Sequence, residues 1–295
     1  MNTEPAQPVV VRRARTAGTP GTPLRVLLLH GLAGSAAVWA PFAERADPAC
    51  ELWTAELPWR GFGIRGWHER PADAWVEQAV ARLPDAPDVV VGHSFGANAV
   101  LAWLSRQDQP SHRTPRGAVL ISPFYRPREE HFDWEAMSYY LNRFQDVLSD
   151  GLRVSSRGQL APDVREEMAR KVRDRIGPYG WMRFFDTYLN TPRLPVERMS
   201  MPFLILGGGT DIAAFPDEAR SLARALPDAT ARILPDAGHF TMVERAAEFA
   251  EAVNGFLRTL TAPPAPDAGH SAASADASAD RSSDRSADLS AMEYD

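Results

Sequence analysis

The sequence predicts an α/β fold in which a mostly parallel sheet has helices on both faces and carries a helical cap insertion. Three observations predict it. Short apolar runs recur along the chain, segments with helix signals lie between them, and one long aromatic-rich stretch interrupts this alternation. Near-continuous apolar strands joined by helical crossovers are typical of a parallel sheet that is buried on both faces.

Six apolar runs are predicted to form the main strands of the sheet. The first, residues 24–29, reads Leu-Arg-Val-Leu-Leu-Leu and has the character of a buried strand. An earlier segment, residues 9–13, is a candidate antiparallel edge strand. The other five runs are residues 51–57, 88–91, 116–121, 202–206 and 230–234.

Helices are predicted between these strands. Start and stop signals in the sequence place five of them. They are expected at about residues 36–45, 71–83, 95–106, 216–226 and 242–260.

Residues 123–195 break the alternation of strand and helix. They contain no convincing strand, and aromatic side chains recur through them. A run of this length between two strands is too long for a plain loop. We therefore expect a helical cap above the carboxyl edge of the sheet, where open α/β sheets place their ligands. Residues 23–122 and 196–260 then form the core, after an N-terminal segment at residues 1–22.

Composition excludes several classes of protein. No stretch approaches the roughly 20 apolar residues that a membrane span needs, and residues 1–8 do not resemble a secretory signal. Cys50 is the only cysteine, so nothing favours an oxidising compartment. We expect a cytoplasmic protein with no membrane partner, and the oligomeric state stays open.

The net charge of −6 is concentrated near the C-terminal end of the chain. Residues 261–295 contain seven acidic and two basic residues, so the preceding part is nearly neutral. It therefore has no basic stripe of the kind that binds nucleic acid. The end is rich in Ser, Ala and Asp and almost lacks apolar residues, which predicts a disordered acidic tail.

The most informative motif is Gly-His-Ser-Phe-Gly at residues 92–96. It follows a β-branched run and opens a predicted helix, which is the strand, sharp turn and helix of a nucleophile elbow. Gly92 and Gly96 suit this turn because a β-carbon on either flank would clash with the closely approaching backbone. The elbow holds Ser94 with its hydroxyl exposed above the sheet.

Together with three further motifs, the elbow resembles the α/β-hydrolase fold superfamily, in members with a helical cap between the sixth and seventh strands. The likeness covers about residues 24–260. His-Gly-Leu-Ala-Gly-Ser at residues 30–35 is similar to the loop that supplies part of the oxyanion hole. A strand and glycine-rich turn lead to Asp211, and Pro-Asp-Ala-Gly-His-Phe at residues 235–240 resembles the loop of the family's histidine.

Ser94, Asp211 and His239 follow one another in the family's order of nucleophile, acid and base. A serine does not ionise at neutral pH and needs a base, and an imidazole with an unperturbed pKa of about 6.5 suits that role. Asp211 would hold His239 in the required tautomer and stabilise its cation. Asp217 and Asp236 compete for the role of the acid, since either also suits a helix cap or a turn.

The backbone N–H groups of Leu32 and Phe95 are predicted to bind the oxyanion, and loss of one such donor typically costs about 2.7–4 kcal/mol. His30 and His93 belong to the motif loops and are expected to be scaffold. No pair of histidines has metal-ligand spacing with a nearby acid, so neither a metal site nor a cofactor is expected.

These residues predict a serine hydrolase that cleaves an ester, thioester or lactone of a small to medium, largely apolar substrate through an acyl-enzyme. Candidate substrate-binding residues are Trp59, Tyr139, Trp181 and Phe185. Trp59 and Arg60 replace a small residue and an imidazole of many members; we expect them to pack this loop, or else to narrow the pocket or offer a cation. Serine in place of aspartate excludes the ester-intermediate chemistry of epoxide hydrolases and haloalkane dehalogenases.

Two alternatives remain open at the level of sequence. The same triad can serve acyl transfer, carbon–carbon bond hydrolysis, perhydrolysis or an elimination. From another class, the fold can be a receptor-like module that binds a small molecule with negligible turnover. In both cases the partner is a small molecule.

Overall fold

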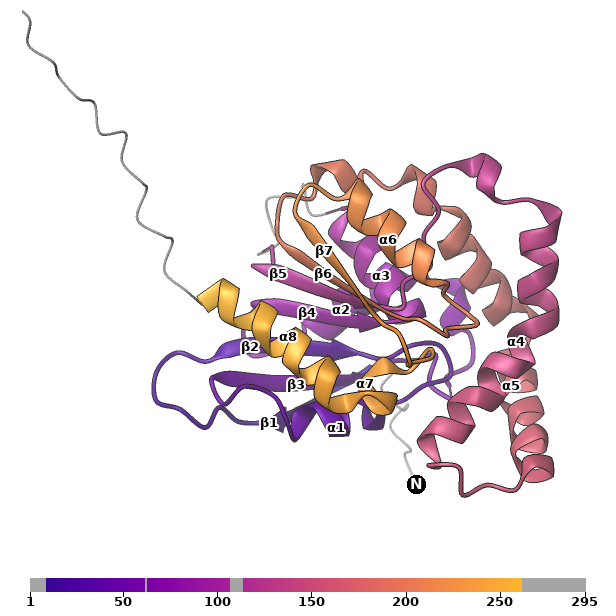
Figure 1. Ribbon diagram of the computed structural model, residues 1–295, viewed down its shortest axis with the longest axis horizontal. Coiled ribbons are helices and arrows are strands. Elements are labelled where there is room, and N and C mark those ends of the chain that lie inside the picture. Colours follow the sequence, from indigo (N-terminus) through magenta and orange to yellow (C-terminus); the bar gives the residue numbers. More distant parts are fainter. Residues whose placement is uncertain (1–8, 62, 107–113, 262–295) are drawn as a thin grey trace, which may run out of the picture. The chain divides into compact units, whose positions relative to one another are not determined.

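Within the described residues, seven strands form one sheet with the spatial order β1-β3-β2-β4-β5-β6-β7 (Figure 1). The computed structural model describes residues 9–61, 63–106 and 114–261. β1 runs antiparallel to β3 at one edge, and all other neighbouring strands are parallel. The predicted α/β class is therefore confirmed. The strands are β1 Val10–Arg15, β2 Leu24–Leu29, β3 Cys50–Glu56, β4 Val89–His93, β5 Gly117–Ile121, β6 Phe203–Gly208 and β7 Ala229–Leu234.

Alternate side chains of the central strands enter two different hydrophobic cores. In β2, Leu27 and Leu29 pack with α2, α3 and α6, whereas Val26 and Leu28 pack with α1, α7 and α8. This is the period of two expected for a strand that is buried on both faces. The helices are α1 Ala40–Ala43, α2 Ala72–Val80, α3 Phe95–Leu104, α6 Pro216–Ala225, α7 Thr241–Glu244 and α8 Ala246–Thr261, with short 3₁₀ helices η1 Ala36–Trp39 and η2 Trp67–Glu69.

Two expected helices are interrupted. The single helix predicted at residues 242–260 is wrong, because Arg245 has φ −130° and ψ 52° and separates α7 from α8. The Glu244 side chain accepts the backbone N–H groups of Gly238 at 3.2 Å and Phe240 at 2.9 Å, so this first turn belongs to the preceding loop. The segment at residues 36–45 is divided into η1 and α1, with Pro41 in the first turn of α1.

The long stretch between β5 and β6 is helical and contains α4 Trp134–Ser155 and α5 Pro162–Leu189, which pack side by side (Figure 1). α5 is kinked where Gly177, with φ 64° and ψ 176°, precedes Pro178. The insertion follows the fifth described strand, not the sixth that the family resemblance implied, because only five strands precede it here. Three 3₁₀ helices flank it: η3 Glu129–His131, η4 Thr191–Arg193 and η5 Val196–Arg198.

The order of the strands reverses between β2 and β4. These strands are neighbours, but the chain continues from β2 to β3 on one side and from β4 to β5 on the other. In parallel α/β sheets, such a switch point leaves a crevice at the carboxyl ends of the strands, where ligands bind. The loop at residues 30–35 and the elbow serine both leave the sheet at this point.

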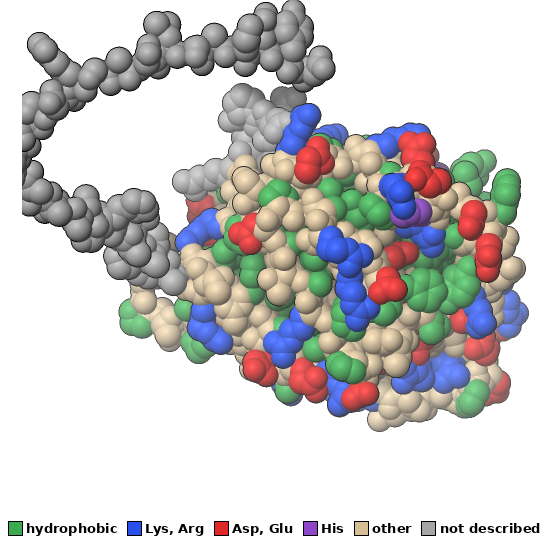
Figure 2. All heavy atoms as spheres, turned by 45° about the horizontal axis from the view of Figure 1, so that its top comes forward, with side chains coloured by type: hydrophobic (Ala, Val, Ile, Leu, Met, Phe, Trp, Pro, Cys, Tyr) green, Lys and Arg blue, Asp and Glu red, His purple; other side chains and the backbone are tan. Residues whose placement is uncertain are grey.

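Charges of both signs are interspersed on the face shown in Figure 2, which presents no continuous basic surface. Among the described helices, none is long and apolar enough to cross a membrane. The predicted acidic tail lies outside the described residues, apart from Thr261, and residues 1–8 of the N-terminal segment do so as well.

Candidate active site

Ser94 occupies the tight turn between β4 and α3. Its φ of 55° and ψ of −127° are unusual for a residue with a β-carbon, and it precedes the first residue of α3. A β-carbon on Gly92 would lie 2.8 Å from the Cα of Ala97, and one on Gly96 would lie 2.5 Å from the carbonyl oxygen of His30. The two glycines therefore allow the strand, the helix and the loop after β2 to meet around the serine.

The structure brings the three predicted catalytic side chains within hydrogen-bond distance of one another. His239 Nε2 lies 2.9 Å from Ser94 Oγ, and His239 Nδ1 lies 2.8 Å from Asp211 Oδ2. Because a carboxylate only accepts hydrogen bonds, the imidazole proton lies on Nδ1, which leaves the Nε2 lone pair facing the serine hydroxyl. All three side chains are buried. The arrangement can transfer the serine proton to the imidazole.

The loop after β7, which carries His239, is held by a histidine of the elbow and a glutamate of α7. His93 Nε2 donates to the carbonyl oxygen of His239 at 2.9 Å, and Glu244 accepts the N–H groups on either side of His239. Burial, together with the neighbouring imidazole of His239, holds the pKa of His93 well below its usual value. His93 is therefore neutral and acts as a scaffold for the imidazole.

The backbone N–H groups of Leu32 and Phe95 have no hydrogen-bond partner within the described part of the chain. Phe95 begins α3, and the loop that carries Leu32 passes so close to the elbow that a β-carbon on Gly31 would lie 2.9 Å from Ser94 Cβ. Unpaired N–H groups beside a nucleophile are the arrangement that stabilises an oxyanion. The two donors predicted from the sequence are thus available for this role.

The same loop is supported by His30 and by the loop after β3. His30 Nδ1 donates to the Gly31 carbonyl at 2.8 Å, and its Nε2 accepts the N–H of Leu57 at 3.0 Å. Burial lowers the pKa of His30, so the ring stays neutral at neutral pH. Trp59 Nε1 donates to the His30 carbonyl, and the Trp59 carbonyl accepts the N–H of Ala33 at 2.8 Å.

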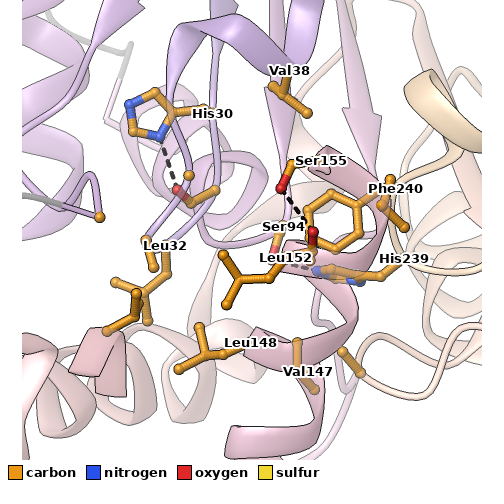
Figure 3. A pocket seen from close by; sticks show the side chains of 18 of the residues that line it. His30, Leu32, Val38, Ser94, Val147, Leu148, Leu152, Ser155, His239 and Phe240 are labelled. Atoms are coloured by element: carbon orange, nitrogen blue, oxygen red, sulfur yellow. Dashed lines mark hydrogen bonds between the residues drawn. The ribbon is translucent and has the colours of Figure 1, made fainter. Parts of the chain in front are cut away.

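A cavity of about 910 Å³ opens above Ser94 and His239. Figure 3 shows these two side chains next to each other, surrounded by Leu32 and by Val147 and Leu148 of α4. Most charged residues on the lining are exposed and mark the opening; these are Arg143, Arg157, Lys171, Asp174 and Arg175. The volume is within the range of roughly 300–1,000 Å³ found for small-molecule sites.

Comparison with known proteins shows the family. A sequence model described as "Alpha/beta hydrolase family" matches residues 26–252. The chain belongs to the α/β-hydrolase family. The 2-hydroxymuconate semialdehyde hydrolase of Pseudomonas putida is 26% identical over 293 residues, covering 87% of this chain and 97% of that protein. The pimeloyl-(acyl-carrier protein) methyl ester esterase of Nitrosospira multiformis is 24% identical, covering 79% and 94%.

Solved structures of low sequence identity share the fold. The enol-lactonase from Burkholderia xenovorans is 18% identical to this α/β-hydrolase, with a TM-score of 0.57 and coverage of 85% of this chain and 96% of that chain. At this level of identity the likeness shows a common fold and nothing about substrate.

Two of the four predicted substrate-binding residues of this α/β-hydrolase line the cavity, and two do not. Tyr139 and Trp181 contribute to the wall. Trp59 is buried beneath the cavity, where its ring packs against Phe95 at 4.9 Å between centroids. Phe185 is also buried but does not line the cavity, because it follows Phe184 on α5 and adjacent helical side chains point about 100° apart. Phe184 lines the cavity, and Phe185 packs behind it.

Several lining residues were not predicted from the sequence. The lining residues of α4 recur at spacings of three and four. This spacing is visible in the sequence and indicates an apolar helix face, but it does not tell whether that face meets a cavity or another helix. Phe124 follows β5 and has no periodicity that marks it. The main unpredicted apolar lining residues are Val38, Phe124, Tyr140, Phe144, Val147, Leu148, Leu152, Phe184 and Phe240.

Among the described residues, no three His, Cys, Asp or Glu side chains are grouped so that they could hold a metal ion. Of the two competing acids, Asp217 pairs with Arg220 and Asp236 pairs with Arg245 at the surface. Asp211 is the carboxylate that reaches His239.

Proposed function

We propose that this α/β-hydrolase is a serine hydrolase that cleaves an ester, thioester or lactone of a small to medium, largely apolar molecule. The observation that carries the proposal is the 2.9 Å contact between His239 Nε2 and Ser94 Oγ at a cavity with apolar walls. An imidazole oriented by a buried carboxylate and aimed at a serine hydroxyl is the arrangement that activates a serine nucleophile.

The proposed reaction starts when Ser94 Oγ attacks the substrate carbonyl carbon while His239 Nε2 takes the hydroxyl proton. The N–H groups of Leu32 and Phe95 stabilise the tetrahedral oxyanion. His239 then gives the proton to the leaving group, and the carbonyl reforms as an acyl-enzyme on Ser94. Water attacks the acyl-enzyme with His239 as general base, which releases the acid and restores the serine. No cofactor takes part.

The cavity supports an apolar acyl group as the part of the substrate that enters. Phe144 and Trp181 stack with ring centroids 3.6 Å apart and form one wall, and Leu148 and Leu152 of α4 lie nearby. Apolar walls around a few polar groups are typical of small-molecule sites. Two relatives are described as a hydrolase and a methyl ester esterase, which agrees with attack on a carbonyl.

Ester hydrolysis tests the proposal directly. We expect p-nitrophenol release from p-nitrophenyl esters of graded acyl length, with a maximum at a chain length that fits the cavity. Ser94→Ala and His239→Ala should each reduce turnover by at least about 10³-fold, because either change removes the activated nucleophile. A fluorophosphonate probe should label the wild-type protein and not Ser94→Ala. Absence of both labelling and turnover in folded wild-type protein would instead support the receptor-like alternative.

The same triad also permits acyl transfer, carbon–carbon bond hydrolysis, perhydrolysis and elimination. A metabolite screen that compares wild type with Ser94→Ala separates these, because each reaction leaves a different product from the consumed compound. Cytoplasmic location and independence of a cofactor stay predictions from the sequence.

A further inference from the structure

Two consecutive tyrosines of α4 bind two consecutive carbonyl groups of the acid loop, which we define as residues 211–215 between β6 and α6. The Tyr139 hydroxyl donates to the Ile212 carbonyl oxygen at 2.8 Å. The Tyr140 hydroxyl donates to the Ala213 carbonyl oxygen at 3.2 Å. The two rings pack edge to face with centroids 5.5 Å apart, so the pair forms one packed unit.

The bound carbonyls belong to the peptide groups that hold the carboxylate of Asp211. Asp211 Oδ1 accepts the N–H of Ala213 at 2.8 Å and the N–H of Ala214 at 3.0 Å. The carbonyl of Ile212 shares a planar peptide with the N–H of Ala213, and the carbonyl of Ala213 shares one with the N–H of Ala214. Each of these planes is therefore fixed at one end by a tyrosine and donates to Asp211 at the other.

We propose that Tyr139 and Tyr140 are positioning residues that hold the Asp211 carboxylate in the orientation needed by His239. The role rests on the proposed function of the triad. It gives the helical insertion a part in catalysis beyond enclosing the cavity, because α4 supplies both hydroxyl groups while the acid loop supplies none of its own.

Buried polar side chains surround the Tyr140 hydroxyl, and none of these side chains donates to the acid loop. Its oxygen lies 3.4 Å from both Glu218 Oε1 and the Tyr188 hydroxyl, and Glu218 also accepts the N–H of Tyr125 at 3.1 Å. Arg126 Nε donates to the Tyr188 hydroxyl at 2.9 Å. Burial, followed by the nearby Glu218 carboxylate, raises the pKa of Tyr140, so the hydroxyl stays protonated and remains a donor at working pH.

Removal of single hydroxyl groups tests the role. Tyr139→Phe and Tyr140→Phe keep the rings that line the cavity, so KM for p-nitrophenyl butyrate should stay within about twofold. We expect kcat to fall roughly tenfold in each variant, because the acid is less well aligned with the imidazole. The rate of fluorophosphonate labelling should fall with kcat. All rates are measured well below the lowest melting temperature of the set.

Tyr188→Phe is the matched control. It removes a buried hydroxyl from the same cluster, but that hydroxyl donates to Glu218 and not to the acid loop. It should lower the melting temperature about as much as Tyr140→Phe while kcat stays close to that of the wild type. Equal losses of kcat in Tyr188→Phe and Tyr140→Phe, or an unchanged kcat in both Tyr139→Phe and Tyr140→Phe, would overturn the proposal.

Tyr139→Phe keeps the test decisive if Tyr140→Phe does not fold, because the Tyr139 side chain is only partly buried. Failure of the proposed function would show in the wild type, as absent turnover and absent labelling at Ser94. Failure of the positioning role would show as unimpaired phenylalanine variants of an enzyme that depends on Ser94.

Discussion

Ser94 keeps a backbone conformation that costs energy for any residue other than glycine. Such strain is of the order of 1–3 kcal/mol and persists only where the surroundings enforce it. The Ser94 N–H donates to the Ile121 carbonyl at 2.8 Å, and the Ser94 carbonyl accepts the N–H groups of Ala97 and Asn98. These backbone bonds fix the turn from both sides, so the hydroxyl direction does not depend on the side chain alone.

Asp211→Asn removes the negative charge of the side chain but keeps its size and one oxygen that can accept hydrogen bonds. The amide oxygen can still accept the N–H groups of Ala213 and Ala214, but the amide N–H₂ would face His239 Nδ1 and favour the wrong tautomer. We expect kcat to fall by about 10⁴-fold with little loss of stability. Asp217→Asn and Asp236→Asn, which alter exposed ion pairs, should keep full activity. Steady-state kinetics measure kcat and thermal melts measure stability. A loss of activity in Asp217→Asn or Asp236→Asn would instead assign the role of the catalytic acid to that residue.

Helices α4 and α5 contribute side chains to the wall of the cavity and so limit its size. Trp181 of α5 lies between Phe144 of α4, which stacks on it, and Phe184, whose ring is nearly parallel at 4.9 Å. Side chains from both helices therefore set the extent of the cavity, and with it the length of the acyl chain that the proposed substrate can carry. The kink at Gly177 lies in α5 on the N-terminal side of this wall.

Trp181→Ala should widen the cavity and shift the chain-length preference. We expect the ratio of kcat/KM for p-nitrophenyl dodecanoate to that for the butyrate to rise by roughly tenfold, since methylene groups in apolar pockets carry discrimination of this size. Trp134→Ala on α4 is the control, because Trp134 is 85% exposed and does not line the cavity. An identical chain-length profile in the wild type and Trp181→Ala would show that the substrate does not reach this wall.

The stability of the whole molecule depends on pH through buried ionisable side chains, of which Glu218, His30 and His93 have shifted pKa values. Burial raises the pKa of Glu218 to about 7, against hydrogen bonds that favour its ionised form. Burial lowers the pKa of His30 and His93. Glu218 thus contributes stability that is fully present below its unfolded pKa near 4.5 and is lost as the pH rises through about 7. The two histidines act in the opposite direction, because below the usual pKa of 6.5 the unfolded chain binds protons on them more readily than the folded protein does, so their contribution to stability falls as the pH drops.

Glu218→Gln isolates the glutamate contribution, because both histidines are the same in the two proteins. Relative to the wild type, the variant should become more stable as the pH rises from 5 to 8, by roughly 3 kcal/mol in total, because the wild-type carboxyl becomes charged while it is buried. Urea unfolding at several pH values measures this difference. Glu166→Gln, a change at an exposed carboxyl whose pKa is lowered by hydrogen bonds from Ser149 and Gln145, should give a flat difference above pH 5. A flat difference for Glu218→Gln as well would contradict the raised pKa.

Local patterns predicted the strands and the order of the motifs well. The run at residues 24–29 is observed as β2 without any change of bounds, because all of its apolar residues are buried and they lie on both faces of the strand. Gly92 marked the elbow through a local requirement, since a β-carbon there would meet the backbone of Ala97. Gly96, in contrast, is required by the carbonyl of His30 in a loop distant along the chain. Trp59 and Phe185 do not line the cavity as candidate substrate-binding residues would, since composition does not tell which neighbour a buried ring meets. The packing role that was also expected for Trp59 fits its burial against Phe95.

The sequence by itself determined the α/β class, the position of the helical insertion along the chain and the three side chains that meet at the switch point. Only the tertiary structure decided the break at Arg245, the burial of Trp59 and the hydrogen bonds from Tyr139 and Tyr140 to the acid loop. The physical reason is the range of the interactions. Strand and turn preferences act over a few residues, whereas the partners of Tyr140 come from segments about 48 to 78 residues away in the chain and are chosen by packing.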